Sequence, residues 1–141
     1  MIGRRTGLIL VVATIVLGAG SCSTKEELAA AEREVEKFHE AFNAGRFDAI
    51  YETATDELKK SATQHDFVAM LETIERKLGK TTGTTRTNWT VNFGTGGTTV
   101  KLIYETSFAQ GKGTETFSYR VSGKKALLMG YDITSKNLLP R

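Results

Sequence analysis

The sequence predicts an α+β domain in which three N-terminal helices pack on a curved, four-stranded antiparallel sheet. Up to residue 78, apolar residues recur at intervals of three and four, which is typical of amphipathic helices. After Gly79, threonine becomes frequent and the apolar period shifts toward two, which is typical of strands. Helices first and strands afterwards indicate segregated layers rather than alternating βαβ units.

The three helices are expected over residues 24–43, 48–60 and 64–78. Either Ser23 or Thr24 can cap the first, because each has a glutamate three residues later. The second is expected to break near residues 55–56. Thr63 can cap the third, and Gly79 ends it.

The four strands are expected over residues 84–93, 98–108, 114–122 and 125–135, with glycine-containing turns between them. In the first strand, Trp89, Val91 and Phe93 share one face. The second strand is apolar on both faces in its middle, which favours a central position. The fourth strand is expected to place four residues inward: Leu127, Met129, Tyr131 and Ile133.

The composition of the 141-residue chain excludes several classes of protein. Apolar residues make up 40% and charged residues 25%, which is ordinary for a globular protein. Removing Arg4 and Arg5 of the leader from the 19 Lys and Arg leaves 17, against 16 Asp and Glu. This balance predicts no nucleic-acid partner. With one cysteine and two histidines, the chain predicts no internal disulfide, no metal site and no cofactor.

The first 21 residues have the parts of a secretory signal peptide. Arg4 and Arg5 form a positive segment, residues 8–17 are almost wholly apolar, and residues 18–21 are small. The apolar run is shorter than the roughly 20 residues that a membrane-spanning helix needs. We therefore expect this segment to be removed.

The stretch Ala19-Gly20-Ser21-Cys22 resembles the lipobox of bacterial lipoproteins, although leucine is commoner where Ala19 stands. The resemblance implies cleavage between Ser21 and Cys22, a diacylglycerol on the Cys22 thiolate, and usually a palmitate-like acyl chain on the new amine. The alternative is an ordinary signal peptide that precedes a cysteine by chance. Because Ser23 stands where aspartate favours inner-membrane retention, the resemblance implies an outer-membrane lipoprotein facing the periplasm.

The predicted organisation is thus a signal peptide (1–21), a lipidated N-terminus with a short linker (22–24), the α+β domain (25–135) and a tail (136–141). Within the domain, the run FHEAFNAGRFDAIY at residues 38–51 resembles the opening of the nuclear transport factor 2-like superfamily, whose cone is also called cystatin-like. The run GKKALLMGYDI at residues 123–133 is similar to that superfamily's last hairpin, except that many relatives have tryptophan near Ala126. More narrowly, the chain looks like the small lipoproteins of that superfamily.

The resemblance implies a pocket between the concave sheet and the helices. Strand parity and helix position give six candidate lining residues: His39, Trp89, Tyr104, Glu115, Tyr119 and Tyr131. We expect His39 on the helix surface, Glu115 at a wet strand end, and buried tyrosine rings. The alternative is a buried Glu115 that acts as a general base, with Tyr104 or Tyr119 holding an oxyanion. No catalytic residue is assigned.

These patterns favour a non-enzymatic, membrane-anchored module that binds a small molecule, a peptide or an envelope partner. Two alternatives stay open: a cone-pocket isomerase or dehydratase, and a structural subunit that forms a homodimer through its sheet. A closed apolar cavity with a buried Glu115 would favour the enzyme. A sheet face exposing Arg86, Lys101 and Arg120, with no cavity, would favour the structural subunit.

Overall fold

The computed structural model describes residues 20–139, which form an α+β fold with one four-stranded antiparallel sheet. The helices are α1 (Gly20–Asn43), α2 (Phe47–Glu52), α3 (Asp56–Ser61) and α4 (Gln64–Leu78). The strands are β1 (Thr81–Gly94), β2 (Gly97–Phe108), β3 (Gly111–Ser122) and β4 (Lys125–Thr134), followed by a short 3-10 helix, η1 (Lys136–Leu138). The predicted signal peptide lies outside the described residues, apart from its last two.

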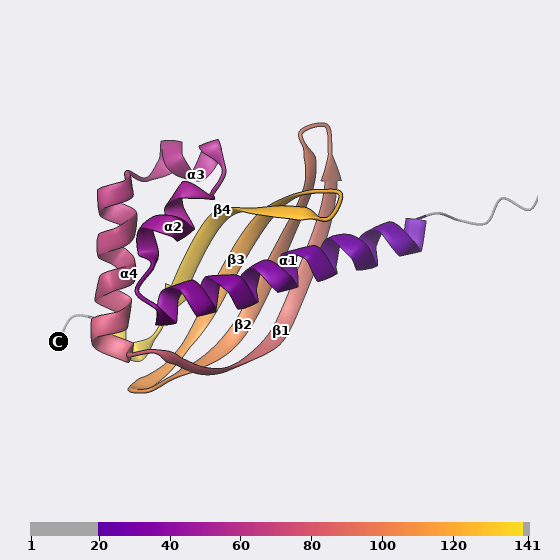
Figure 1. Cartoon of the computed structure of the whole chain (residues 1–141). Helices are drawn as coiled ribbons and strands as arrows, with labels where there is room; N and C mark the ends of the chain where they lie inside the picture. The colour runs from indigo at the N-terminus through magenta and orange to yellow at the C-terminus, as the bar shows by residue number, and fades with distance from the viewer. Residues whose placement is uncertain (1–19, 140–141) are drawn as a thin grey trace, which may run out of the picture.

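Helix α1 crosses the concave face of the curved sheet and packs against all four strands (Figure 1). The predicted apolar stripe makes this contact, because Ala31, Val35 and Phe38 are buried. The helix begins at Gly20, so residues 22–24, which were expected to be a linker with a cap, lie within its first turns. No helix of the described part is long and apolar enough to cross a bilayer.

The helix predicted over residues 48–60 is two helices, α2 and α3, so four α-helices precede the sheet rather than three. The break falls near the expected position. Thr55 has extended backbone angles, and its Oγ1 accepts a hydrogen bond from Leu58 N at 3.3 Å, which caps α3. Thr55 N also donates to Leu128 O of β4 at 2.9 Å, so the break ties the helices to the sheet edge.

The strands pair in chain order, and β2 and β3 are central as a result. The prediction that the second strand is central is therefore confirmed. Val100 of β2 pairs with Tyr119 of β3, and Tyr104 pairs with Glu115. Each pair shares a face, so all four side chains point toward α1, where they are buried.

Strand β4 differs from its predicted parity because its pairing with β3 shifts register between Ser118 and Tyr119. Ser118 pairs with Gly130 and Tyr119 with Leu128, so Met129 has no partner and the strand changes phase. Before this bulge Leu128 is buried, rather than Leu127 and Met129 as predicted. After the bulge, the inward prediction for Tyr131 is confirmed, since its hydroxyl bonds to Glu115.

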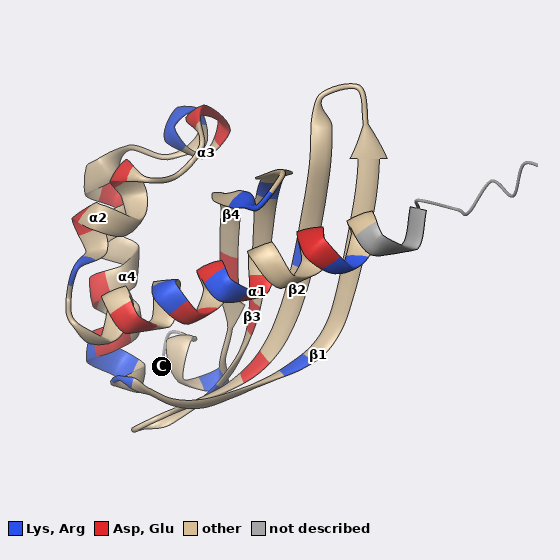
Figure 2. Ribbon diagram, turned by 45° about the vertical axis from the view of Figure 1, so that its right-hand side comes forward, with Lys and Arg blue, Asp and Glu red and all other residues tan. Residues whose placement is uncertain are grey.

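Charged side chains are frequent on the helices and sparse on β1 and β2 (Figure 2). Arg86 of β1 forms an ion pair with Glu32 of α1, and Arg120 of β3 pairs with Glu57 of α3 at 2.8 Å. Two of the three basic side chains that would mark an open basic sheet face are thus joined to helices. The geometry gives the structural-subunit alternative no support from these residues.

Candidate functional site

Glu115 lies at the centre of a buried polar cluster between α1 and the sheet. Its side chain is almost fully buried, with the residue only 1% exposed. The carboxylate oxygen Oε2 accepts from Thr106 Oγ1 at 2.5 Å and lies 2.8 Å from His39 Nε2, while Oε1 accepts from Tyr131 OH at 2.7 Å. Both oxygens therefore have protein partners, as a buried carboxylate requires.

The sheet register explains how three of these groups meet. Glu115 stands opposite Tyr104 on β2 and Ile133 on β4. Thr106 and Tyr131 lie two residues from these partners, on the same face, and so are diagonal neighbours of Glu115. His39 comes from α1 and covers the cluster.

Two expectations about these residues are wrong. Glu115 does not lie at a wet strand end, and His39 is not on the helix surface, since its residue is only 8% exposed. The ring of His39 lies edge-on to Phe38 and to Phe117, with centroids 5.8 and 5.6 Å apart. Position 39 thus flanks the apolar stripe closely enough to be enclosed between α1 and β3.

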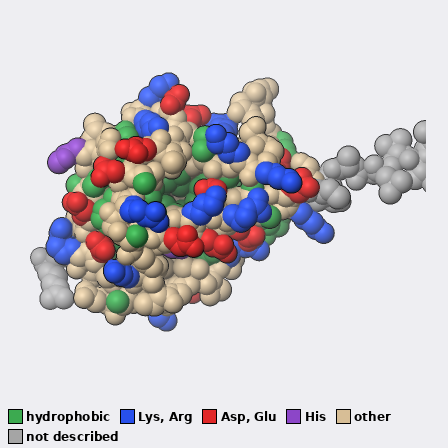
Figure 3. Space-filling view, viewed as in Figure 1, with side chains coloured by type: hydrophobic (Ala, Val, Ile, Leu, Met, Phe, Trp, Pro, Cys, Tyr) green, Lys and Arg blue, Asp and Glu red, His purple; other side chains and the backbone are tan. Residues whose placement is uncertain are grey.

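A separate cleft of about 390 Å³ opens between α1, α2 and the part of β4 before the bulge. Figure 3 shows a hollow over hydrophobic atoms, ringed by charged side chains. Its apolar lining residues are Phe38, Ala41, Ala49, Ile50, Ala126, Leu127 and Leu128. The polar and charged ones are Glu34, Lys37, Glu40, Arg46, Thr53 and Tyr119. This volume lies within the roughly 300–1,000 Å³ typical of small-ligand sites.

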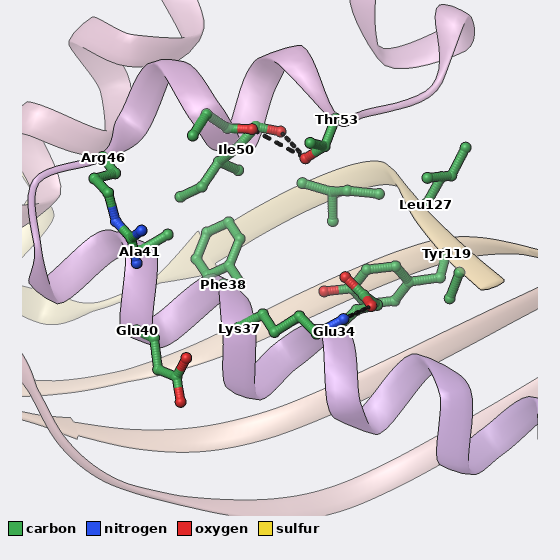
Figure 4. A pocket seen from close by; sticks show the side chains of 13 residues that line it. Glu34, Lys37, Phe38, Glu40, Ala41, Arg46, Ile50, Thr53, Tyr119 and Leu127 are labelled. Carbon is green, nitrogen blue, oxygen red and sulfur yellow. Dashed lines mark hydrogen bonds and ion pairs between the residues drawn. The ribbon is translucent and has the colours of Figure 1, made fainter. Parts of the chain in front are cut away.

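Tyr119 reaches this cleft from β3, and Figure 4 shows its hydroxyl directed toward α1 and Phe38. The residue is only 2% exposed, yet its hydroxyl has no hydrogen-bond partner. Among the described side chains, one other buried oxygen is in this position, Oε2 of Glu27. An unpaired buried hydroxyl costs about 1–3 kcal/mol, so a ligand that accepts a hydrogen bond from the Tyr119 hydroxyl would recover this cost.

Burial raises the pKa of Tyr119 well above its ordinary value, and the negative charges of Glu34 and Glu115 act in the same direction. The phenol therefore stays protonated at physiological pH and can donate a hydrogen bond. Tyr119 is suited to an uncharged or anionic acceptor, such as a carbonyl, ether or carboxylate oxygen.

The two cationic side chains that line the cleft, Lys37 and Arg46, differ in whether they are paired with a carboxylate. Lys37 is paired with Glu34 at 2.6 Å, as the dashed line in Figure 4 marks. Arg46, in the loop between α1 and α2, also lines the cleft. Within residues 20–139, its guanidinium is in none of the ion pairs. A cation at one end of an apolar cleft favours a ligand with an anionic group there.

The six candidate residues thus separate into four places. His39, Glu115 and Tyr131 form the buried cluster, Tyr119 lines the cleft, and Tyr104 packs edge-on to Phe117 at a centroid distance of 6.0 Å. Trp89 lies on edge strand β1 and is 44% exposed, so it lines neither site. The sequence-based candidates did not include Thr106 of the buried cluster or Arg46 of the cleft. Thr106 could have been predicted to face inward, because it has the same strand parity as Tyr104.

No family model matches this chain, and a comparison with curated proteins finds no significant match. In the part of the chain that the structure describes, no three His, Cys, Asp or Glu side chains are grouped so as to hold a metal ion.

Proposed function

We propose that this protein is a lipid-anchored module of the bacterial cell envelope that binds a small amphipathic ligand in the cleft between α1, α2 and β4. The observation that carries the binding function is the buried, unpartnered hydroxyl of Tyr119 within an apolar-lined cleft of ligand size. The ligand has an apolar body, a hydrogen-bond acceptor for Tyr119, and an anionic group near Arg46.

The membrane anchor of this proposal rests on the lipobox-like residues before Cys22 and on the leader that precedes them. Acyl chains on Cys22 would hold the domain at a membrane surface, most consistently the periplasmic face of the outer membrane. Two or three chains bind stably, since each buried methylene contributes about 0.8 kcal/mol.

The proposed family is the nuclear transport factor 2-like, or cystatin-like, superfamily. Its support is the similarity of residues 38–51 and 123–133, together with a long helix laid across a curved antiparallel meander. In that superfamily the pocket lies between these two layers, which agrees with where the cleft opens.

Binding is favoured over catalysis by the way Glu115 is used. This carboxylate is buried, as the enzyme alternative requires, but its three contacts are all protein side chains and it does not line the cleft. A general base has to reach a proton of the substrate. The Glu115 cluster instead ties α1 to three strands, which is a structural role.

Replacing Cys22 with serine is expected to leave an uncut, unacylated precursor, because a hydroxyl cannot replace the thiolate that takes the lipid. Intact-mass measurement of the membrane-extracted protein should show a wild-type chain that starts at Cys22 and carries acyl groups. The control is a substitution at the neighbouring residue, Ser23→Ala, which should be cleaved and acylated normally. If Cys22→Ser were still cut to the same start, the anchor would be wrong.

Native mass spectrometry of the protein from its own membranes is expected to show a co-purifying small molecule. Ala49→Trp, at an exposed cleft position on α2, should fill the cleft and remove the extra mass. Tyr119→Phe removes one hydroxyl and should weaken retention about tenfold, the equivalent of one hydrogen bond of ~1.4 kcal/mol. Tyr104→Phe is the matched control outside the cleft. Wild-type protein free of any ligand would count against the binding function.

A further inference from the structure

The largest exposed aromatic side chains of the described residues lie together on β1. Phe93 is 62% exposed and Trp89 is 44% exposed. They are four residues apart on one strand face, with the partly buried Val91 between them. Their cross-strand partners are Thr98 and Leu102 of β2, so they point to the side of the sheet that α1 covers.

This aromatic pair, Trp89 and Phe93, lies beside the N-terminal end of α1. Thr98, the cross-strand partner of Phe93, donates from its Oγ1 to Glu27 at 3.3 Å. Further along α1, Glu32 holds Arg86 of β1 in an ion pair. In Figure 1 the N-terminal end of α1 extends past β1. The aromatic pair on β1 and the N-terminal end of α1 therefore lie at the same end of the molecule.

The hydrogen bond between Thr98 and Glu27 lies close to the proposed anchoring residue, Cys22. Cys22 and Glu27 are five residues apart within α1, a rise of about 7.5 Å at 1.5 Å per residue. The acylated sulfur has to lie near the glycerol level of the bilayer, and the headgroup region of one leaflet is roughly 5–8 Å thick. A bilayer that holds Cys22 therefore comes within reach of the end of the β1–β2 hairpin.

We infer that Trp89 and Phe93 form a second membrane contact and insert into the headgroup region of the bilayer that anchors Cys22. This inference rests on the proposed lipid anchor. Tryptophan and phenylalanine suit this depth because their rings are apolar and the indole N–H can bond to headgroup oxygens. Because the lipid anchor already holds the domain at the membrane, insertion of the aromatic pair is intramolecular, and a patch of two side chains is sufficient for it. The contact then fixes the orientation of the cleft relative to the membrane.

The sequence supplies its own probe, because Trp89 is the only tryptophan of the chain. The acylated protein is reconstituted in vesicles of phosphatidylethanolamine and phosphatidylglycerol, with and without acyl-brominated phosphatidylcholine. Trp89 emission is expected to shift to shorter wavelength and to be strongly quenched by the brominated lipid. Phe93→Ala should weaken the quenching while leaving the anchor intact.

The matched control moves the probe to the other face of the same strand with Trp89→Phe and Asn88→Trp together, and its emission should stay unquenched. Equal, weak quenching at both positions in a protein that floats with the vesicles would overturn the inference and leave the anchor standing. A blue-shifted but unquenched Trp89 with cross-linked dimers would assign the patch to a second copy instead. A chain that carries no acyl groups and does not float would remove the anchor and this inference together.

Discussion

Replacing Glu115 with alanine is expected to lower the free energy of unfolding by about 3–5 kcal/mol, because each buried group left without a hydrogen-bond partner costs about 1–3 kcal/mol and a cavity adds to this cost. The loss has two causes. The substitution leaves the buried hydroxyls of Thr106 and Tyr131 without their acceptor, and the ring nitrogen of His39 without its hydrogen-bond partner. It also leaves a cavity at a residue that is only 1% exposed.

Glu115→Gln is the shape-matched variant for this test. It keeps the volume and one acceptor oxygen, but its amide nitrogen can no longer accept from a hydroxyl. We therefore expect a smaller loss than for alanine. Urea unfolding followed by circular dichroism measures both, and Glu105→Ala, on the exposed side of β2, should change stability by no more than about 0.5 kcal/mol. An alanine variant as stable as the wild type would mean that the cluster does not hold α1 on the sheet.

The parts of the fold that local patterns encode were predictable. The stripe of α1 and the alternation of β3 depend on residues three, four or two positions apart, so the sequence shows them directly. Glu115, Phe117 and Tyr119 were expected to share a face, and all three are buried together. A break was expected near residues 55–56, and the structure has one there, where Thr55 caps α3.

The remaining features depend on contacts between distant segments. His39 and Glu115 are 76 positions apart, so their contact has no signal in either segment alone. His39 lies beside Phe38 at the edge of the helical stripe and Glu115 lies between two threonines, so polarity predicted an exposed position for both. The bulge at Met129 also has no signature in its own strand. It arises from the pairing with β3, and it reverses the inward set of residues before it.

The cleft was the least predictable feature for the same reason. It is bounded by α1, α2 and the part of β4 before the bulge, and no one of these segments contains it. Tyr119 could be placed on the inner face by parity, but its lack of a hydrogen-bond partner is a property of the assembled layers. Strand parity therefore predicts the inward position of Tyr119, whereas the unpaired hydroxyl that makes it a binding candidate depends on the packing of α1 and α2 on the sheet.

Replacing Phe117 with alanine is expected to cost about 3–5 kcal/mol of stability, the usual range for truncating a buried phenylalanine. Phe117 is fully buried on β3, and its ring contacts five others, those of Phe38, His39, Tyr104, Tyr119 and Tyr131. It lies between the Glu115 cluster and the cleft and packs against residues of both. The two sites share this support, so we expect one substitution to disturb both.

The joint effect separates Phe117 from an ordinary core residue. Phe117→Leu keeps most of the apolar volume and is expected to fold, but it removes the ring that stacks on Tyr119 at a centroid distance of 6.3 Å. We expect Phe117→Leu to lose more co-purifying ligand in native mass spectrometry than its modest loss of stability alone would explain. Leu71→Ala, a buried truncation in α4 outside the cleft, is the control for stability alone. Equal ligand retention by Phe117→Leu and wild type would contradict this coupling, because the orientation of Tyr119 would then not depend on the ring beneath it.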